Sequence, residues 1–164
     1  INEEDTKVFD PEFCFYGPMG YDIGNVIANM IFAWANGDAA GAEDFCKWVE
    51  SVLVDVVNMT KEKMEKYYDE HVTDTMCKNA LYKKYYMDTI IEDTSAVTGL
   101  ELIRRIVGMA NVKDITTIAD EAKRARAEKI CITAAIDFIK NRNDKKCGKC
   151  FLRTLKDAIA EIDA

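Results

Sequence analysis

Proline is almost missing from this chain, and its scarcity does most to limit what the chain can fold into. Both prolines stand within the first 18 residues, so no fixed φ angle or missing N–H interrupts a helix in the remainder. Apolar residues there recur at intervals of three and four, which is typical of amphipathic helices. The sequence therefore predicts a mainly α fold, with helices over about 21–35, 42–71, 79–92, 97–110, 120–141 and 150–162 and one short turn near 115–118.

The charge of the chain limits its partners. The formal net charge is −7 with a pI near 4.8, and acidic and basic residues are interspersed. Proteins that bind nucleic acid usually present a basic face, so nucleic acid is disfavoured as a partner. No apolar run approaches the roughly 20 residues that cross a bilayer, and the acidic start of the chain disfavours a signal peptide. We expect a single globular domain with no membrane partner.

The cysteines indicate the compartment. Cysteines stand at positions 14, 46, 77, 131, 147 and 150, spread out rather than clustered as in small secreted proteins. We therefore expect a reducing, cytoplasmic location. Cys147 and Cys150 have the spacing of half a zinc ribbon, but a structural zinc site needs four ligands and His71 is the only histidine. A redox role would need a βαβ context, which is missing, so the sequence favours an incidental pair. It favours helix packing over base stacking for the tyrosines within 82–86.

The opening segment is the one departure from helix. Residues 6–9 are Thr-Lys-Val-Phe, a short run that we interpret as one strand of a half-buried sheet. At its end Asp10 and Glu12 flank Pro11, which stiffens the turn. Carboxylates in such a turn are either plain loop residues or hard oxygen ligands for Mg²⁺, which often shares its shell with phosphates. A glycine-containing loop then leads to Asp22 at a helix start, an order that suggests a phosphoryl-transfer site.

Two further groups of charged residues stand out. In the first turn of a helix, Asp22 would stabilise the unpaired amides and the positive helix end by about 1 kcal/mol. Arg104 and Arg105 are adjacent, so a helix directs them about 100° apart. Their neighbours Ile103 and Ile106 are apolar. By themselves the two arginines are typical of side chains that flank a core face and extend towards solvent.

Two stretches carry a resemblance to a known family. VFDPEFCFYGPMGYDIGNVIANM, residues 8–30, resembles the metal-binding segment of S-methyl-5-thioribose kinases, and LIRRIVG, residues 102–108, resembles their paired-arginine helix. These kinases share the aminoglycoside-phosphotransferase and protein-kinase-like fold. The resemblance runs to about Asn143. It implies the helical part of the C-terminal lobe of that fold, with a short β-ribbon remnant at the N-terminus.

The resemblance also implies roles for individual residues. Asp10 and Glu12 would be the Mg²⁺ ligands, Asp22 would support the catalytic loop, and Arg104 and Arg105 would contact the sugar substrate. In this family the catalytic Asp lies upstream of the metal strand, and the nucleotide-binding lobe lies earlier still. Neither is present here, so we expect a C-terminal part that depends on that missing lobe and is inactive alone.

The expected organisation is a single helical domain. Residues 1–19 would form the metal-loop ribbon, 20–143 the helical bundle and 144–164 a C-terminal helical extension. The intact kinase would use ATP and Mg²⁺ to phosphorylate the 1-hydroxyl of S-methyl-5-thioribose, and a homodimer is compatible with the family. A kinase for a cationic alcohol is disfavoured, because such substrates suit acidic pockets rather than paired arginines. The alternative is a non-catalytic kinase-like module for protein association, with the tyrosines within 82–86 as its contact face.

Overall fold

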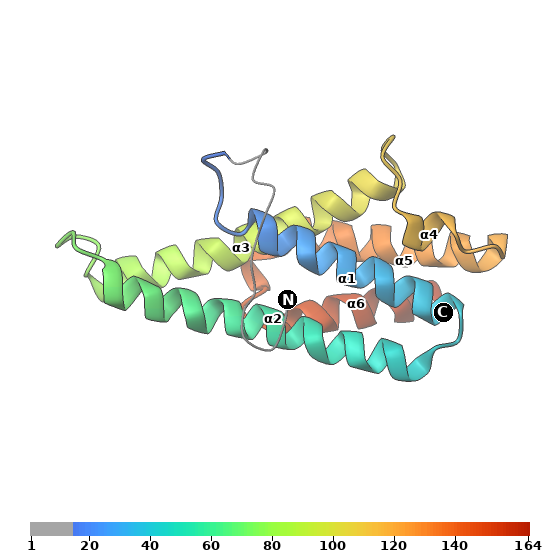
Figure 1. Cartoon of the computed structure of the whole chain (residues 1–164), viewed down its shortest axis with the longest axis horizontal. Helices are drawn as coiled ribbons and strands as arrows, with labels where there is room; N and C mark the ends of the chain where they lie inside the picture. The colour runs from blue at the N-terminus through green and yellow to red at the C-terminus, as the bar shows by residue number, and fades with distance from the viewer. Residues whose placement is uncertain (1–14) are drawn as a thin grey trace, which may run out of the picture.

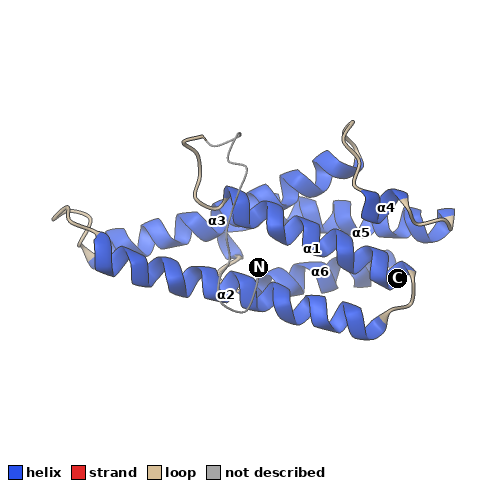
Figure 2. Cartoon of the chain, viewed as in Figure 1, coloured by secondary structure: helices blue, strands red, loops and turns tan. Residues whose placement is uncertain are grey.

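The computed structural model describes residues 15–164, and the described part is a bundle of α-helices without a strand (Figures 1 and 2). The mainly α prediction is confirmed. The expected ribbon in residues 1–14 lies outside the described residues. The elements are α1 (Tyr21–Ala39), α2 (Glu43–His71), α3 (Ala80–Ile106), α4 (Lys113–Thr116), α5 (Glu121–Lys140), the 3-10 turn η1 (Arg142–Asp144) and α6 (Gly148–Ile162).

The core forms around α1, which packs against α2, α3 and α5 (Figure 1). Its residues Ile27, Ile31 and Phe32 have no exposed surface. On the far side of the bundle α6 closes the core against α5 and α2, where the rings of Phe138 and Phe151 lie 5.3 Å apart. Each such side chain contributes about 2 kcal/mol when it leaves water, so the packing of α1 and α6 holds the bundle together.

Helix α3 differs from the prediction, because the two helices expected over 79–92 and 97–110 are one continuous helix that ends at Ile106. Residues 93–95 are Asp, Thr and Ser, which favour caps and turns when their side chains compete with the backbone. In the structure Thr94 donates to the carbonyl of Ile90 at 2.8 Å, and Ser95 donates to the carbonyl of Phe138 at 2.8 Å. Both side chains are buried and satisfied, so the helix continues.

A glycine allows α1 and α3 to approach closely. A Cβ at Gly24 would lie 2.7 Å from the Cβ of Val97 and 2.8 Å from the carbonyl oxygen of Thr94, closer than real contacts. Across this contact Thr98 Oγ1 donates to the Gly24 carbonyl at 3.2 Å and to the Thr94 carbonyl at 2.8 Å. The first turns of α1 are thereby held against the middle of α3, next to the arginine pair.

The first helix ends later than the sequence indicates. The helix expected over 21–35 continues to Ala39, and Gly37 is buried within it against the Phe45 ring. The left-handed residue is Gly41, with φ of 74°. A glycine occupies this conformation without the strain that a Cβ causes, so the α1–α2 turn is set by Gly41.

Helices α2 and α3 extend beyond the bundle as a hairpin, seen at the left of Figure 1. Helix α2 has 29 residues, which at about 1.5 Å per residue exceeds the length of its partners. The side of this hairpin carries an open apolar hollow of about 460 Å³. Within residues 15–164 no helix combines the length and the apolar character that crossing a membrane requires.

Candidate functional site

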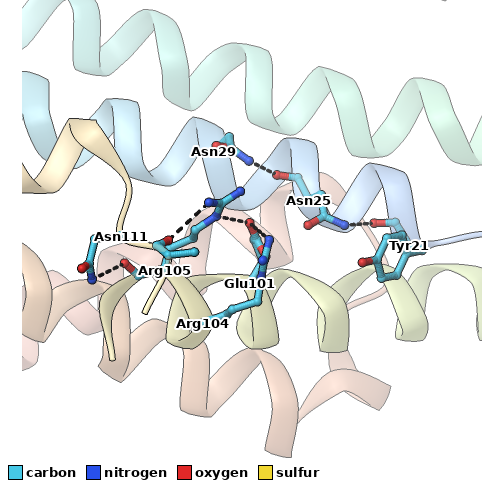
Figure 3. A network of polar contacts seen from close by, with 8 residues as sticks. Tyr21, Asn25, Asn29, Glu101, Arg104, Arg105 and Asn111 are labelled. Carbon is cyan, nitrogen blue, oxygen red and sulfur yellow. Dashed lines mark hydrogen bonds and ion pairs between the residues drawn. The ribbon is translucent and has the colours of Figure 1, made fainter. Parts of the chain in front are cut away.

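The arginine pair lies at the C-terminal end of α3, where Glu101 holds both guanidinium groups (Figure 3). Side chains three and four residues apart share one face of a helix. Arg104 Nε donates to Glu101 Oε2 at 2.7 Å and Arg104 Nη2 donates to Oε1 at 2.9 Å. Arg105 Nε donates to the same Oε1 at 2.8 Å. One carboxylate therefore draws together two arginines that the helix itself would direct apart.

The three side chains of the cluster differ in how much of their surface is exposed to solvent. Only 5% of the Glu101 side chain is exposed, whereas 32% of Arg105 and 55% of Arg104 are exposed. Burial alone would raise the pKa of Glu101, but the hydrogen bonds and charges of Arg104 and Arg105 outweigh it and lower that pKa. The hydrogen bond to Glu101 in turn raises the pKa of Arg104. One carboxylate and two guanidinium groups give the cluster a net positive charge.

The cluster has more hydrogen-bond donors than Glu101 can accept from. A guanidinium group has five N–H donors, and Glu101 accepts from only two N–H groups of Arg104 and one of Arg105. Arg105 Nη1 also donates to the carbonyl of Ala110 at 3.2 Å. Among the contacts between residues 15–164, the other N–H groups of the two arginines have no hydrogen-bond partner. This arrangement suits a ligand with phosphate or hydroxyl oxygens, which arginine binds with fixed geometry.

The end of α3 is capped by a side chain from the following loop. Asn111 Nδ2 donates to three carbonyl oxygens, that of Arg105 at 3.2 Å and those of Ile106 and Gly108 at 3.3 Å. The last carbonyls of a helix have no partner within the helix. Asn111 satisfies them while positive charge stands at the negative end of the helix, which is electrostatically favourable. The backbone that carries Arg105 is therefore fixed.

A polar strip on α1 lies alongside the cluster (Figure 3). Tyr21, Asn25 and Asn29 follow one another at intervals of four residues. Asn25 Nδ2 donates to the Tyr21 carbonyl at 2.9 Å and Asn29 Nδ2 donates to the Asn25 carbonyl at 2.8 Å. The candidate site is therefore the surface between α1 and the end of α3.

The other sequence-predicted site residues have different positions. Asp22 is exposed in the first turn of α1, which begins at Tyr21. Asp10 and Glu12 lie outside the described residues. Within the described part of the chain, no group of three or more His, Cys, Asp or Glu side chains could hold a metal ion. The structure thus brings together Arg104 and Arg105 and leaves the metal ligands as predictions.

Sequence reasoning missed Glu101 and the polar strip of α1. The spacing of Glu101, three and four residues before two arginines, was a usable signal because such pairs meet on a helix. No comparable signal marked Tyr21, Asn25 and Asn29, because their proximity to α3 depends on how the two helices pack. The tyrosines within 82–86 lie on the hairpin instead, where Tyr86 packs on Tyr68 with ring centroids 5.6 Å apart.

Comparisons with known proteins agree with the family seen in the sequence motifs. Methylthioribose kinase 1 of Oryza sativa subsp. japonica is 33% identical over an alignment that covers 87% of this chain and 37% of that kinase. The methylthioribose kinase of Bacillus pumilus is 32% identical, and the match covers 98% of this chain and 40% of that kinase. The methylthioribose kinase of Escherichia coli is 29% identical, and the match covers 89% of this chain and 38% of that kinase. No protein-family model matches the chain.

The matches cover nearly all of this chain but much less than half of each relative. A match of 33% identity that covers 87% of this chain is too extensive to arise from one shared motif. The extent is consistent with the expected match to a C-terminal part. The chain spans about 37% of the length of the rice and 40% of the length of the Bacillus kinase, and it is related to part of the methylthioribose kinases.

Proposed function

We propose that this chain is the C-terminal part of a kinase that transfers the γ-phosphate of ATP to the 1-hydroxyl of S-methyl-5-thioribose. The proposal is carried by one observation, the assembly of Arg104 and Arg105 on the buried carboxylate of Glu101. The names of the similar proteins support the substrate and the reaction class. The arginines are the residues that the resemblance assigns to the substrate.

The arginine cluster would act by position and charge. Phosphoryl transfer depends mainly on aligning the reactants and stabilising the charge of the transferring group. The N–H groups of Arg104 and Arg105 that Glu101 does not bind would bind the oxygens of the sugar. Their net positive charge would stabilise negative charge that develops near the acceptor hydroxyl. Glu101 would keep both guanidinium groups in place before the substrate arrives, so less freedom is lost on binding.

Magnesium and ATP belong to the proposal through Asp10, Glu12 and the rest of the kinase. Two carboxylates separated by one residue are a donor set that fits Mg²⁺, and a bound Mg²⁺ would offset charge on phosphate oxygens. We assign ATP binding and the catalytic Asp to the part of the kinase that this chain does not match. We therefore expect the 164-residue chain alone to show no phosphorylation of S-methyl-5-thioribose.

The test is conservative substitution of the arginines in the full-length gene product. Arg104→Lys and Arg105→Lys keep the charge but remove the planar fork of donors. Loss of one transition-state hydrogen-bond donor costs about a factor of 100 in turnover, and we expect a loss of that order from at least one variant. Arg142→Lys, at an exposed arginine on η1, is the matched control. Full turnover in both variants would refute the assignment.

The second candidate function is association without catalysis, and the α2–α3 hairpin favours it. Large apolar side chains are exposed there, with 62% of Tyr67, 83% of Met76 and 79% of Leu81 accessible. Such surfaces are often covered by a partner, and we take a second copy of the chain as that partner. ATP binding by the longest natural gene product separates the two functions. A kinase binds ATP with Mg²⁺, whereas a purely associating module shows no ATP binding and sediments as a dimer.

A further inference from the structure

Cys147 and Cys150 form a close thiol pair at the start of α6. Cys147 has an extended backbone and precedes the first turn of the helix, and Cys150 N–H donates to its carbonyl at 2.9 Å. This geometry places the two Sγ atoms 3.3 Å apart. From the sequence we expect an incidental pair, because further zinc ligands and the βαβ context of a redox motif are both missing. Two thiols in contact need no other ligand to react with each other.

The segment that carries the pair is fixed on both sides. The N–H of Gly148 donates to Asn58 Oδ1 on α2 at 2.9 Å. Lys146 Nζ forms an ion pair with Glu92 on α3 at 2.7 Å. These contacts with α2 and α3 fix the backbone around the two cysteines, so the short distance between their sulfur atoms is a consequence of the fold.

The environment of Cys150 favours a reactive thiolate. Burial alone would raise its pKa, but the hydrogen bond with the Cys147 thiol, hydrogen bonding to the backbone of Lys146 and Cys147, and the charge of Arg153 together lower it. The positive end of α6 acts in the same direction. Both cysteines are partly exposed, so a small molecule can reach them.

Two other cysteines provide the contrast. Cys46 and Cys131 are buried. Burial raises the pKa of both thiols, and that of Cys131 rises to about 12. Such thiols react slowly because the thiolate is the nucleophile. Cys77 is partly exposed, as Cys147 and Cys150 are, and lies on the α2–α3 turn. It is the matched single thiol.

We propose that Cys147 and Cys150 are a dithiol site that exchanges with external disulfides and is thereby converted to an intramolecular disulfide. The Cys150 thiolate attacks one sulfur of R–S–S–R, forms a mixed disulfide and releases R–S⁻, which takes up a proton. Cys147 then loses its proton and attacks the Cys150 sulfur, which expels the second R–S⁻. The two cysteines lose two electrons and two protons, and the external disulfide is reduced to two R–SH.

Peptide mapping with oxidised glutathione as the probe tests this proposal. Trypsin cleaves after Lys146, Lys149 and Arg153, so the disulfide would join the peptide 147–149 to the peptide 150–153. We expect this linked pair as the main product of the folded, unmutated chain. We expect it to form about tenfold faster than glutathione adds to Cys77, because the lowered pKa of Cys150 favours its thiolate and the second thiol stands in contact with it. Absence of the linked pair would overturn the proposal.

Single substitutions separate the two steps. In Cys147→Ser the reaction should stop at a stable glutathione adduct on Cys150, because no second thiol can displace it. In Cys150→Ser, Cys147 should react no faster than Cys77. Cys77→Ser should leave the linked pair unchanged. An adduct on Cys150 that forms as slowly as the adduct on Cys77 would refute the assignment of Cys150 as the attacking thiol.

Discussion

Glu101 and Arg105 stand one helical turn apart on α3, and Arg105 Nε donates to Glu101 Oε1 at 2.8 Å. The same oxygen accepts from Arg104 Nη2 at 2.9 Å. A buried carboxylate that serves two cations is costly to create unless its hydrogen bonds are complete. The end of α3 thus concentrates one negative and two positive charges in a small volume, and the stability of the chain should respond to changes there.

Glu101→Gln should destabilise the chain. The amide keeps the size of the side chain but loses the charge, and its NH₂ group can accept from neither arginine. Hydrogen bonds to charged groups contribute about 2 kcal/mol, and we expect a loss of that order in urea unfolding at neutral pH. Glu62→Gln, at an exposed position on α2, is the control and should change stability little. Equal effects of the two substitutions would contradict the role of Glu101.

The pH dependence of this loss follows from the lowered pKa of Glu101 in the folded chain. The carboxylate stabilises the fold fully above its ordinary pKa of 4.5, and the contribution disappears as the pH falls through the lower folded-state value. The stability gap between the wild-type chain and Glu101→Gln should therefore narrow as the pH falls below 4.5. Other carboxylates titrate equally in both proteins and cancel. A gap that stays constant would contradict the ion-pair interpretation.

Lys145 offers a second test of buried charge. Only 5% of Lys145 is exposed, and its Nζ forms an ion pair with Asp137, which also accepts from Thr154 Oγ1 at 2.7 Å. Burial alone would raise the pKa of Asp137, but these hydrogen bonds and one from Asn141 lower it. Lys145→Met leaves the carboxylate without its cation. Because the Asp137 side chain is 35% exposed and keeps its hydrogen bonds from Asn141 and Thr154, the loss should be about 1 to 2 kcal/mol.

The double variant Lys145→Met with Asp137→Asn removes both charges. The stability lost in the double variant should be smaller than the sum of the two single losses, because neither charge is then left without its partner. Urea unfolding of the four proteins measures the coupling. Additive losses would show that Lys145 and Asp137 act independently.

The fold was largely predictable from the sequence, because helix periodicity and the lack of proline are local signals. The helix bounds near residues 42, 71, 141 and 162 agree with the structure to within about two residues, the usual uncertainty of helix ends. The break expected around residues 93–96 was wrong. Thr94 and Ser95 favour turns only while their hydroxyls lack better partners, and here packing supplies the carbonyl of Phe138. Tertiary contacts decided that element.

The candidate site was predictable only in part. Arg104 and Arg105 came from the resemblance, since their residue types alone favour an ordinary surface. Glu101 was visible in its spacing. Lys145, in contrast, stands in a polar, lysine-rich segment, and no local pattern in the sequence indicates that it is buried in an ion pair with Asp137. Asp10 and Glu12 remain predictions.

Gly24, at the contact between α1 and α3, and Gly41, in the α1–α2 turn, should respond differently to substitution. Gly24→Ala would place a Cβ 2.7 Å from Val97 Cβ, and overpacking of a core contact costs about 1 to 3 kcal/mol. Gly41→Ala meets no atom within 4 Å, so only its φ of 74° opposes the change, at about 1 kcal/mol. Gly41→Asn should be milder because asparagine tolerates this conformation. Thermal unfolding ranks the three, and a stable Gly24→Ala would contradict the close approach.

Asp22 separates a local role from a role in catalysis. Its carboxylate is exposed in the first turn of α1, where interaction with the positive helix end contributes about 0.5 kcal/mol and is screened by salt. Asp22→Asn should therefore lower the stability of this chain only slightly, and less so at high salt. If Asp22 supports a catalytic loop, as the family resemblance implies, the same substitution should strongly reduce turnover in the full-length gene product. Exposed Asp157→Asn on α6 is the control for both assays. Unchanged turnover in Asp22→Asn would leave this residue with its local role in the helix and exclude the supporting one.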